Sequence, residues 1–245
     1  MQYIPPAINT PWRAALVALL VTITGCAQLA NRSGGPSTQA APAVALARDQ
    51  YTSTIEHFEQ LDRENPPKPG GALFVGSSTF TKWTEIPTVF KEFDAANRAF
   101  GGSVSADQLK YMDRIVIPRK PAKIVYYCGE NDIAAGAPAE QVAQNFAKFV
   151  EHVHAALPRT KIYFVAMKIC PSRIRFEQTV RKGNDLVRAY TQQDPQRLRF
   201  IDINPVILDD QGKPLPGIYV LDNLHFNAKG YELITPLIKR ALETN

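Results

Sequence analysis

The chain has 245 residues, of which 45% are hydrophobic and 21% charged, and this composition is that of an ordinary globular protein. Its length suffices for one well-buried α/β domain or at most two small ones, and we expect one. The formal net charge is +5, and the basic residues are scattered without interleaved aromatic residues, so nucleic-acid binding is unsupported.

The first 25 residues have the pattern of a removable targeting segment. Arg13 precedes an uncharged run over residues 14–24, which has the length of a signal-peptide core and is too short to span a membrane. We therefore predict that residues 1–25 are a signal peptide and take no part in the fold.

The uncharged run ends in Ile-Thr-Gly followed by Cys26, which resembles the lipobox of bacterial lipoproteins. The resemblance implies cleavage before Cys26 and diacylation of its thiol. Acyl chains would hold the protein at a membrane without a transmembrane helix, since each buried methylene contributes ~0.8 kcal/mol. Ala27, by resemblance to the bacterial sorting rule, implies the outer membrane, with the protein facing the periplasm. The alternative is an ordinary secretory signal that happens to contain a cysteine.

Residues 26–47 comprise this cysteine and a stretch rich in Ala, Ser, Gly, Pro and Gln, which predicts a flexible tether. The folded domain is predicted over residues 48–245. Its first helix is expected over 54–61, where three large apolar residues recur at helical spacing, and a Pro- and Gly-rich stretch over 65–71 then precedes the first strand.

Strands and helices alternate from that point on. Short apolar runs bounded by Pro and Gly predict strands buried on both faces, at residues 72–75, 95–99, 123–128, 161–167 and 198–203. Helices are predicted over 105–115, 142–153, 184–192 and 229–243. Strands joined by helical crossovers form a parallel sheet with helices on both faces. The fold class is therefore α/β, a single three-layer α/β/α sandwich with a five-stranded parallel sheet.

Four short polar segments are expected at the ends of these strands, at the sheet edge where open α/β folds place their active sites. A serine hydroxyl becomes a nucleophile when a base removes its proton and a third group orients the base. Ser78 follows the first strand, and Asp222 and His225 precede the last helix. We predict that Ser78 is the nucleophile, that His225 takes its proton, and that Asp222 receives the other imidazole N–H.

The tetrahedral intermediate of such a reaction needs hydrogen-bond donors for its oxyanion. Gly102 can present a bare backbone N–H, Asn131 a side-chain amide, and Ser78 its own backbone N–H. These three residues are the predicted oxyanion hole.

The order and types of these residues are similar to those of the SGNH hydrolases, also called GDSL lipases and esterases. The family's Ser, Gly, Asn and His correspond to Ser78 in GSST, Gly102 in FGGS, Asn131 in GEND and His225 in DNLH, and its Asp corresponds to Asp222. The resemblance covers about residues 72–235, and four ordered matches are far more specific than one. It implies a flavodoxin-like sandwich, with neither a metal nor an organic cofactor.

The chain departs from the family at one point, because the usual Gly-Asp-Ser-Leu reads Gly-Ser-Ser-Thr here. Ser77 is therefore a rival nucleophile, although the family spacing points to Ser78. Each motif alone also has a plainer interpretation. Gly-Ser-Ser can be a simple turn, Asn131 and Asp132 can cap a helix, and His225 can be a surface histidine. Their joint order favours the catalytic interpretation.

Other side chains have weaker assignments. Arg98 can orient the second motif, contact an acidic substrate group or make a surface ion pair. Three basic residues after the fourth strand can line the same rim, although solvent exposure is the favoured interpretation; they are Lys168, Arg173 and Arg175. Phe80 and Trp83 are expected to pack under the nucleophile turn, and His57, His152 and His154 to be solvated helix positions. Cys128 and Cys170 are more plausibly small core residues than a disulfide.

The sequence therefore predicts a serine esterase that acts through an acyl-enzyme on a small-molecule or glycan ester. A lysophospholipid, a short acyl ester and an O-acetylated glycan remain open as substrates. The alternative is a non-catalytic envelope protein that binds an acyl or sugar ligand on the same fold.

Overall fold

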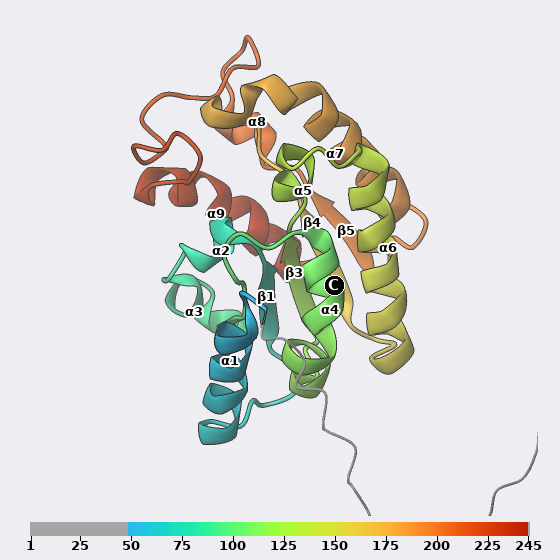
Figure 1. Cartoon of the computed structure of the whole chain (residues 1–245). Helices are drawn as coiled ribbons and strands as arrows, with labels where there is room; N and C mark the ends of the chain where they lie inside the picture. The colour runs from blue at the N-terminus through green and yellow to red at the C-terminus, as the bar shows by residue number, and fades with distance from the viewer. Residues whose placement is uncertain (1–48, 245) are drawn as a thin grey trace, which may run out of the picture. The chain divides into compact units, whose positions relative to one another are not determined.

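The computed structural model describes residues 49–244, so the predicted signal peptide, the lipidation site at Cys26 and the tether lie outside the described residues. One five-stranded sheet, with strand order β2-β1-β3-β4-β5, forms the centre of the described part (Figure 1). Every neighbouring pair is parallel. The strands are β1 (Ala72–Gly76), β2 (Ala96–Asn97), β3 (Lys123–Tyr127), β4 (Lys161–Val165) and β5 (Leu198–Ile201).

Helical segments connect the strands and complete the chain. The longer helices are α1 (Thr52–Glu64), α4 (Ser105–Ile115), α6 (Ala139–Ala156), α7 (Glu177–Thr191) and α9 (Ala228–Glu243). The shorter α-helices are α2 (Ser78–Thr81), α3 (Ile86–Val89), α5 (Glu130–Ala134) and α8 (Asn204–Ile207), and the 3-10 turns are η1 (Lys91–Phe93), η2 (Ile117–Arg119) and η3 (Pro171–Phe176). Among them there is no helix of the length and apolar character needed to cross a bilayer.

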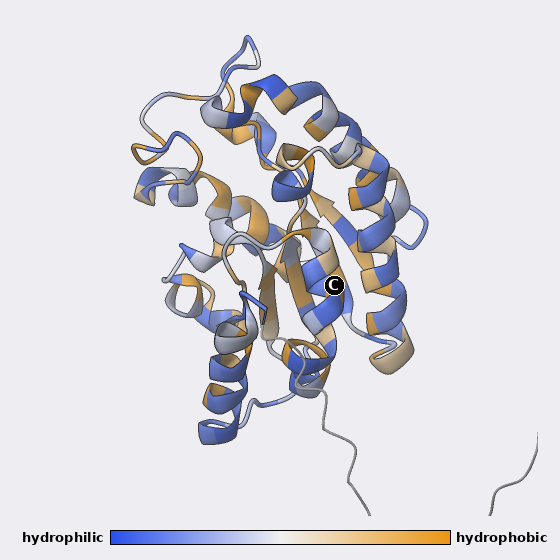
Figure 2. Ribbon diagram, in the orientation of Figure 1, coloured by the Kyte–Doolittle hydropathy of each residue, from blue (hydrophilic) through white to orange (hydrophobic). Residues whose placement is uncertain are grey.

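The sheet separates two apolar cores, because side chains of successive strand residues point to opposite faces. Leu73 and Val75 of β1 pack in the core that includes residues of α1, α4, α6 and α7. Ala72 and Phe74 pack in the other core, with residues of α2, α3, α8 and α9. Apolar residues are correspondingly concentrated on the strands in Figure 2. The predicted three-layer α/β/α sandwich is confirmed.

All five predicted strands are present, with shorter bounds at several ends. The second strand contains two residues instead of the predicted five. The helix predicted over 184–192 begins seven residues earlier, at Glu177, because buried Val180 extends the apolar face of α7 toward its N-terminus. The short helices α2 and α5, which directly follow β1 and β3, were not predicted.

Candidate active site

The nucleophile turn is built by a glycine at the end of β1. Gly76 has a φ of +136°, and a Cβ atom there would lie 1.9 Å from the backbone oxygen of Tyr127 on β3, so no other residue fits. Ser77 is then extended, and Ser78 is the first residue of α2. Ser77 is buried, whereas Ser78 is half-exposed, so the turn presents the second serine at the carboxyl edge of the sheet.

A tight loop before α9 carries the histidine. Asp222 Oδ1 accepts hydrogen bonds from the backbone N–H groups of Leu224 and His225, each 2.9 Å long. The backbone N–H of Val220 donates to the oxygen of His225 over 2.9 Å. These bonds hold Asp222 and His225 in one turn, which faces the end of β1.

The structure brings Ser78, His225 and Asp222 together in the predicted sequence of contacts. Ser78 Oγ lies 2.9 Å from Nε2 of His225, and Nδ1 of His225 lies 2.6 Å from Oδ2 of Asp222. With Nδ1–H donating to Asp222, Nε2 is left as the acceptor for the Ser78 proton. The rival Ser77 instead contacts Asn131.

The carboxylate of Asp222 is stabilised in its charged form. Desolvation raises the pKa of Asp222, but hydrogen bonds from the His225 ring and from the two backbone N–H groups outweigh it and hold this pKa well below its usual range. Asp222 is therefore a charged acceptor for Nδ1–H of His225, which fixes the imidazole tautomer.

The second and third motifs meet beside the serine. A Cβ atom on Gly101 would lie 3.8 Å from Cβ of Ser78, so the loop that contains Gly102 passes next to the nucleophile turn. Asn131, on α5, donates from Nδ2 to Ser77 Oγ (2.8 Å) and to the backbone oxygen of Ser103 (3.0 Å). Asn131 thereby links the nucleophile turn to the second motif.

Two of the three predicted oxyanion donors are open in this arrangement. Within residues 49–244, the backbone N–H groups of Ser78 and Gly102 have no hydrogen-bond partner. Both N–H bonds of the Asn131 amide already donate, one to Ser77 Oγ and one to the backbone oxygen of Ser103. Asn131 can therefore bind an oxyanion only if the oxyanion takes the place of one of these two acceptors.

Arg173 contributes to the site, and its predicted solvent exposure is wrong. Its Nη2 donates to Oδ1 of Asn131 over 2.7 Å, and the residue is half-buried. This bond fixes which end of the Asn131 amide faces Ser77. Arg175 is exposed as expected, with its guanidinium over the Phe176 ring.

The expected solvent exposure of Lys168 is wrong, because the residue is 2% exposed. Its ammonium pairs with Glu130 (2.9 Å) and donates to Thr79 Oγ1 (3.0 Å) and to the Tyr127 hydroxyl (3.1 Å). Sequence reasoning also missed Glu130. The available signal was that both charged residues closely follow neighbouring strands, at the edge that carries the motifs.

The remaining assignments are mostly as expected. Phe80 and Trp83 are buried, and Cys128 and Cys170 are buried free cysteines. Arg98 forms an ion pair with Asp62, which also binds Arg119. Residues His57 and His152 are exposed, but His154 is half-buried and lies 2.9 Å from the Thr160 oxygen, and burial lowers its pKa.

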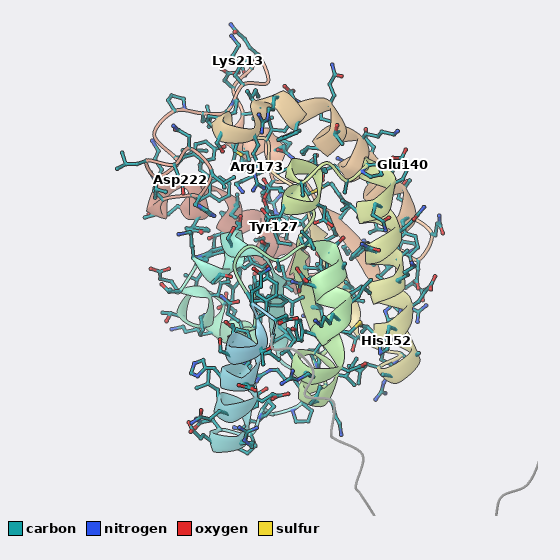
Figure 3. The ribbon with its side chains drawn as sticks, viewed as in Figure 1. Tyr127, Glu140, His152, Arg173, Lys213 and Asp222 are labelled. Carbon is teal, nitrogen blue, oxygen red and sulfur yellow. The ribbon has the colours of Figure 1, made fainter. Side chains whose placement is uncertain are left out.

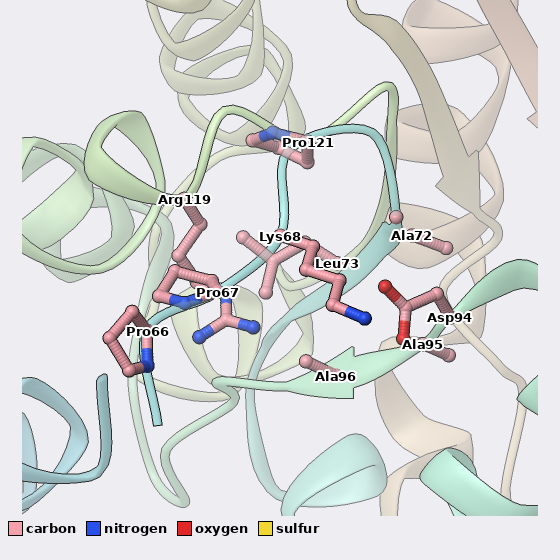
Figure 4. Close-up of a pocket in the computed structure, with 11 residues that line it drawn as sticks. Pro66, Pro67, Lys68, Ala72, Leu73, Asp94, Ala95, Ala96, Arg119 and Pro121 are labelled. Atoms are coloured by element: carbon pink, nitrogen blue, oxygen red, sulfur yellow. The ribbon is translucent and has the colours of Figure 1, made fainter. Parts of the chain in front are cut away.

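Figure 3 labels Asp222, Arg173 and Tyr127 in the part of the view that contains this edge, whereas His152 lies near the other end of the molecule, on α6. A cavity of about 240 Å³ lies at the opposite edge, where β1 and β2 begin, and Arg119 and Asp94 are among its lining residues (Figure 4). It is therefore separate from the site. No cluster of three or more potential metal ligands occurs in the described range.

Comparison with known sequences agrees with the motif order. The sequence model of the GDSL-like Lipase/Acylhydrolase family matches residues 74–233, well over half of the chain. An N-acylneuraminate cytidylyltransferase of Escherichia coli O18:K1:H7 is 24% identical over 162 residues, which cover 65% of this chain and 37% of that protein. The chain thus spans little more than a third of the length of this curated relative.

Solved structures share the fold at low identity. A provisionally assigned acylhydrolase of Bacteroides fragilis superposes with a TM-score of 0.69 at 23% identity, over 80% of this chain and 97% of its own. A GDSL-like lipase of Bacteroides thetaiotaomicron superposes with a TM-score of 0.67 at 21% identity, over 77% of this chain and 97% of its own. A mutant acetyl-xylooligosaccharide esterase of Geobacillus superposes with a TM-score of 0.58 at 12% identity, over 73% of this chain and 96% of its own. The chain belongs to the GDSL-like lipase/acylhydrolase family.

Proposed function

We propose that the protein is a serine esterase that works through an acyl-enzyme, with Ser78, His225 and Asp222 as its catalytic residues. The observation that carries this proposal is the 2.9 Å separation of Ser78 Oγ from His225 Nε2, with Asp222 bound to the other ring nitrogen. A non-catalytic binding protein would have no need of this continuous set of contacts.

In the proposed reaction, Ser78 Oγ attacks the ester carbonyl as its proton passes to Nε2 of His225. The resulting oxyanion accepts from the backbone N–H groups of Ser78 and Gly102, and from Asn131 after an exchange of acceptors. His225 then protonates the leaving alcohol. Water repeats the sequence, releases the acid and restores Ser78.

The rim of the site favours an ester with an apolar chain. The described residues expose three large apolar side chains, Ile174, Val220 and Leu221, with Leu221 projecting fully into solvent. All lie on the two segments that also carry Arg173 and Asp222. The Ser172 N–H joins these segments by donating to the Asn223 oxygen over 3.1 Å. A lysophospholipid or another medium-chain acyl ester fits this rim better than an acetylated glycan.

The acetyl ester remains the second candidate, because a structural relative from Geobacillus is an acetyl-xylooligosaccharide esterase. Rates on acetyl, octanoyl and lysophospholipid esters and on acetylated xylan separate the two. We expect longer chains to be preferred, and we expect Leu221→Ser to reduce the octanoyl rate while leaving the acetyl rate unchanged. A preference for acetylated xylan would reject the proposal that the substrate carries a longer apolar chain.

The nucleophile is tested on soluble protein of residues 27–245. We expect a fluorophosphonate to label Ser78, and we expect Ser78→Ala to lose labelling and about 10⁴- to 10⁶-fold in kcat. Ser77→Ala is the matched control, because it removes the neighbouring hydroxyl and should retain labelling. Labelling that persists in Ser78→Ala would reject the assignment.

The cellular location is also a proposal. The lipobox-like sequence before Cys26 supports attachment to the outer membrane of a bacterial envelope through acyl chains. Such an anchor would keep the esterase close to membrane lipids, which agrees with an apolar ester as substrate.

A further inference from the structure

Lys168 occupies an unusual position for a cation. Its side chain is 1% exposed and that of Glu130 is 7% exposed. The three N–H bonds of an ammonium are matched here by Thr79, Tyr127 and Glu130. The Tyr127 hydroxyl in turn donates to Glu130. Every polar group of this cluster therefore has a partner.

Such a cluster is a poor source of stability. Removing two charges from water costs several kcal/mol for each ion, and apolar replacements of buried ion pairs are often neutral or stabilising. The partners of this lysine suggest a different benefit.

Besides Tyr127, Lys168 contacts three residues that are each the sequence neighbour of a proposed site residue. Thr79 follows Ser78, Glu130 precedes Asn131, and Phe226 follows His225. The ammonium hydrogen bonds to the first two and lies 5.6 Å from the Phe226 ring centroid. Thr79 is held a second time, because the Tyr231 hydroxyl donates to its backbone oxygen over 2.8 Å.

We propose that Lys168, paired with Glu130, is a positioning residue that sets the relative placement of the nucleophile turn, α5 and the histidine loop. Lys168 follows β4, and the segments that it joins lie far apart in the sequence. No backbone hydrogen bond joins the nucleophile turn to the histidine loop in the described range. The ammonium thus ties together side chains that must remain aligned to within fractions of an ångström for proton transfer.

The test removes the pair without leaving a buried charge. The double variant Lys168→Met/Glu130→Gln should fold with a thermal midpoint equal to or above that of the wild type. We expect its kcat on p-nitrophenyl acetate to fall at least tenfold with KM changed less than threefold, and its fluorophosphonate labelling to slow in parallel. Lys168→Arg, which keeps charge and donors, should retain more of the rate than Lys168→Met does, with rates compared per folded molecule.

The matched control is Arg114→Met/Glu59→Gln, which removes an ion pair of 2.7 Å between α1 and α4, outside the site. It should leave kcat unchanged. An active-site double variant with wild-type kcat, or one that does not fold, would overturn the positioning role. This inference rests on the proposed serine mechanism. A failure of that mechanism would be recognised separately, because activity would then survive Ser78→Ala.

Discussion

At the scale of single residues, the orientation of Asn131 depends on Arg173. The guanidinium binds Oδ1 of Asn131, so Nδ2 is directed toward Ser77 and the nucleophile turn. We expect Arg173→Met to lower kcat by about ten- to a hundredfold, the equivalent of one charge-assisted hydrogen bond. Asn131→Ala should cost about 10²- to 10³-fold. Steady-state kinetics check both, and an additive double variant would contradict the proposed dependence.

Asp222 gives a prediction on pH and stability. Its pKa is lower in the folded protein than in the unfolded chain, where it is about 3.9. Its stabilising contribution is therefore complete above the unfolded value and is lost as the pH falls through the lower folded value. Urea unfolding of the wild type and Asp222→Asn should give a constant difference near neutrality that narrows below about pH 4. If the difference in free energy of unfolding between the two proteins widened on acidification, the pKa of Asp222 would not be lowered by folding.

The site residues differ in how far the sequence could identify them. Ser78, Gly102, Asn131, Asp222 and His225 stand in recognisable motifs, and the structure brings the serine, aspartate and histidine into contact as predicted. Their proposed catalytic roles remain predictions. The partners of Asn131 and the burial of Lys168 could not be predicted, because they depend on side-chain packing between segments separated by dozens of residues.

At the scale of elements, the end of β1 depends on Gly76. Ala at this position would have to adopt a φ of +136° and place Cβ 1.9 Å from the Tyr127 oxygen. We expect Gly76→Ala to destabilise the fold by roughly 3 kcal/mol or more, or to prevent folding. Gly136→Ala is the matched control, since Gly136 has a φ of +96° but open space around its Cβ position. We expect Gly136→Ala to lower the free energy of unfolding by about 1–2 kcal/mol.

Strand prediction succeeded because each strand except β2 combines an apolar run with clear turn signals. β2 lies at the sheet edge and pairs through two residues, and its sequence of one alanine and one asparagine is too short to carry a pattern. The helices α2 and α5 were missed for a physical reason. They are four and five residues long, too short for a hydrophobic period, and they form because the chain must turn at the end of a buried strand.

At the scale of the whole molecule, two faces of one sheet and a shared carboxyl edge explain why four distant motifs converge. Parallel strands bring the segments after β1, β2 and β3 to one edge, and the loop before α9 returns to it. The α/β class followed from alternation of strands and helices alone. The strand order did not, because it depends on which crossovers pass over which face of the sheet.

The last prediction concerns attachment of the whole molecule to a membrane. If Cys26 is diacylated, full-length protein should incorporate radiolabelled palmitate and sediment with membranes when expressed in bacteria, and Cys26→Ala should lose both properties. Cys128 and Cys170 are buried, and burial raises the pKa of both thiols. These two thiols are therefore poor acceptors of an acyl group. Cys170→Ala is the matched control, and it should still incorporate radiolabelled palmitate. Palmitate incorporation that persists in Cys26→Ala, or that is absent from the wild type, would reject the lipoprotein assignment while leaving the esterase proposal intact.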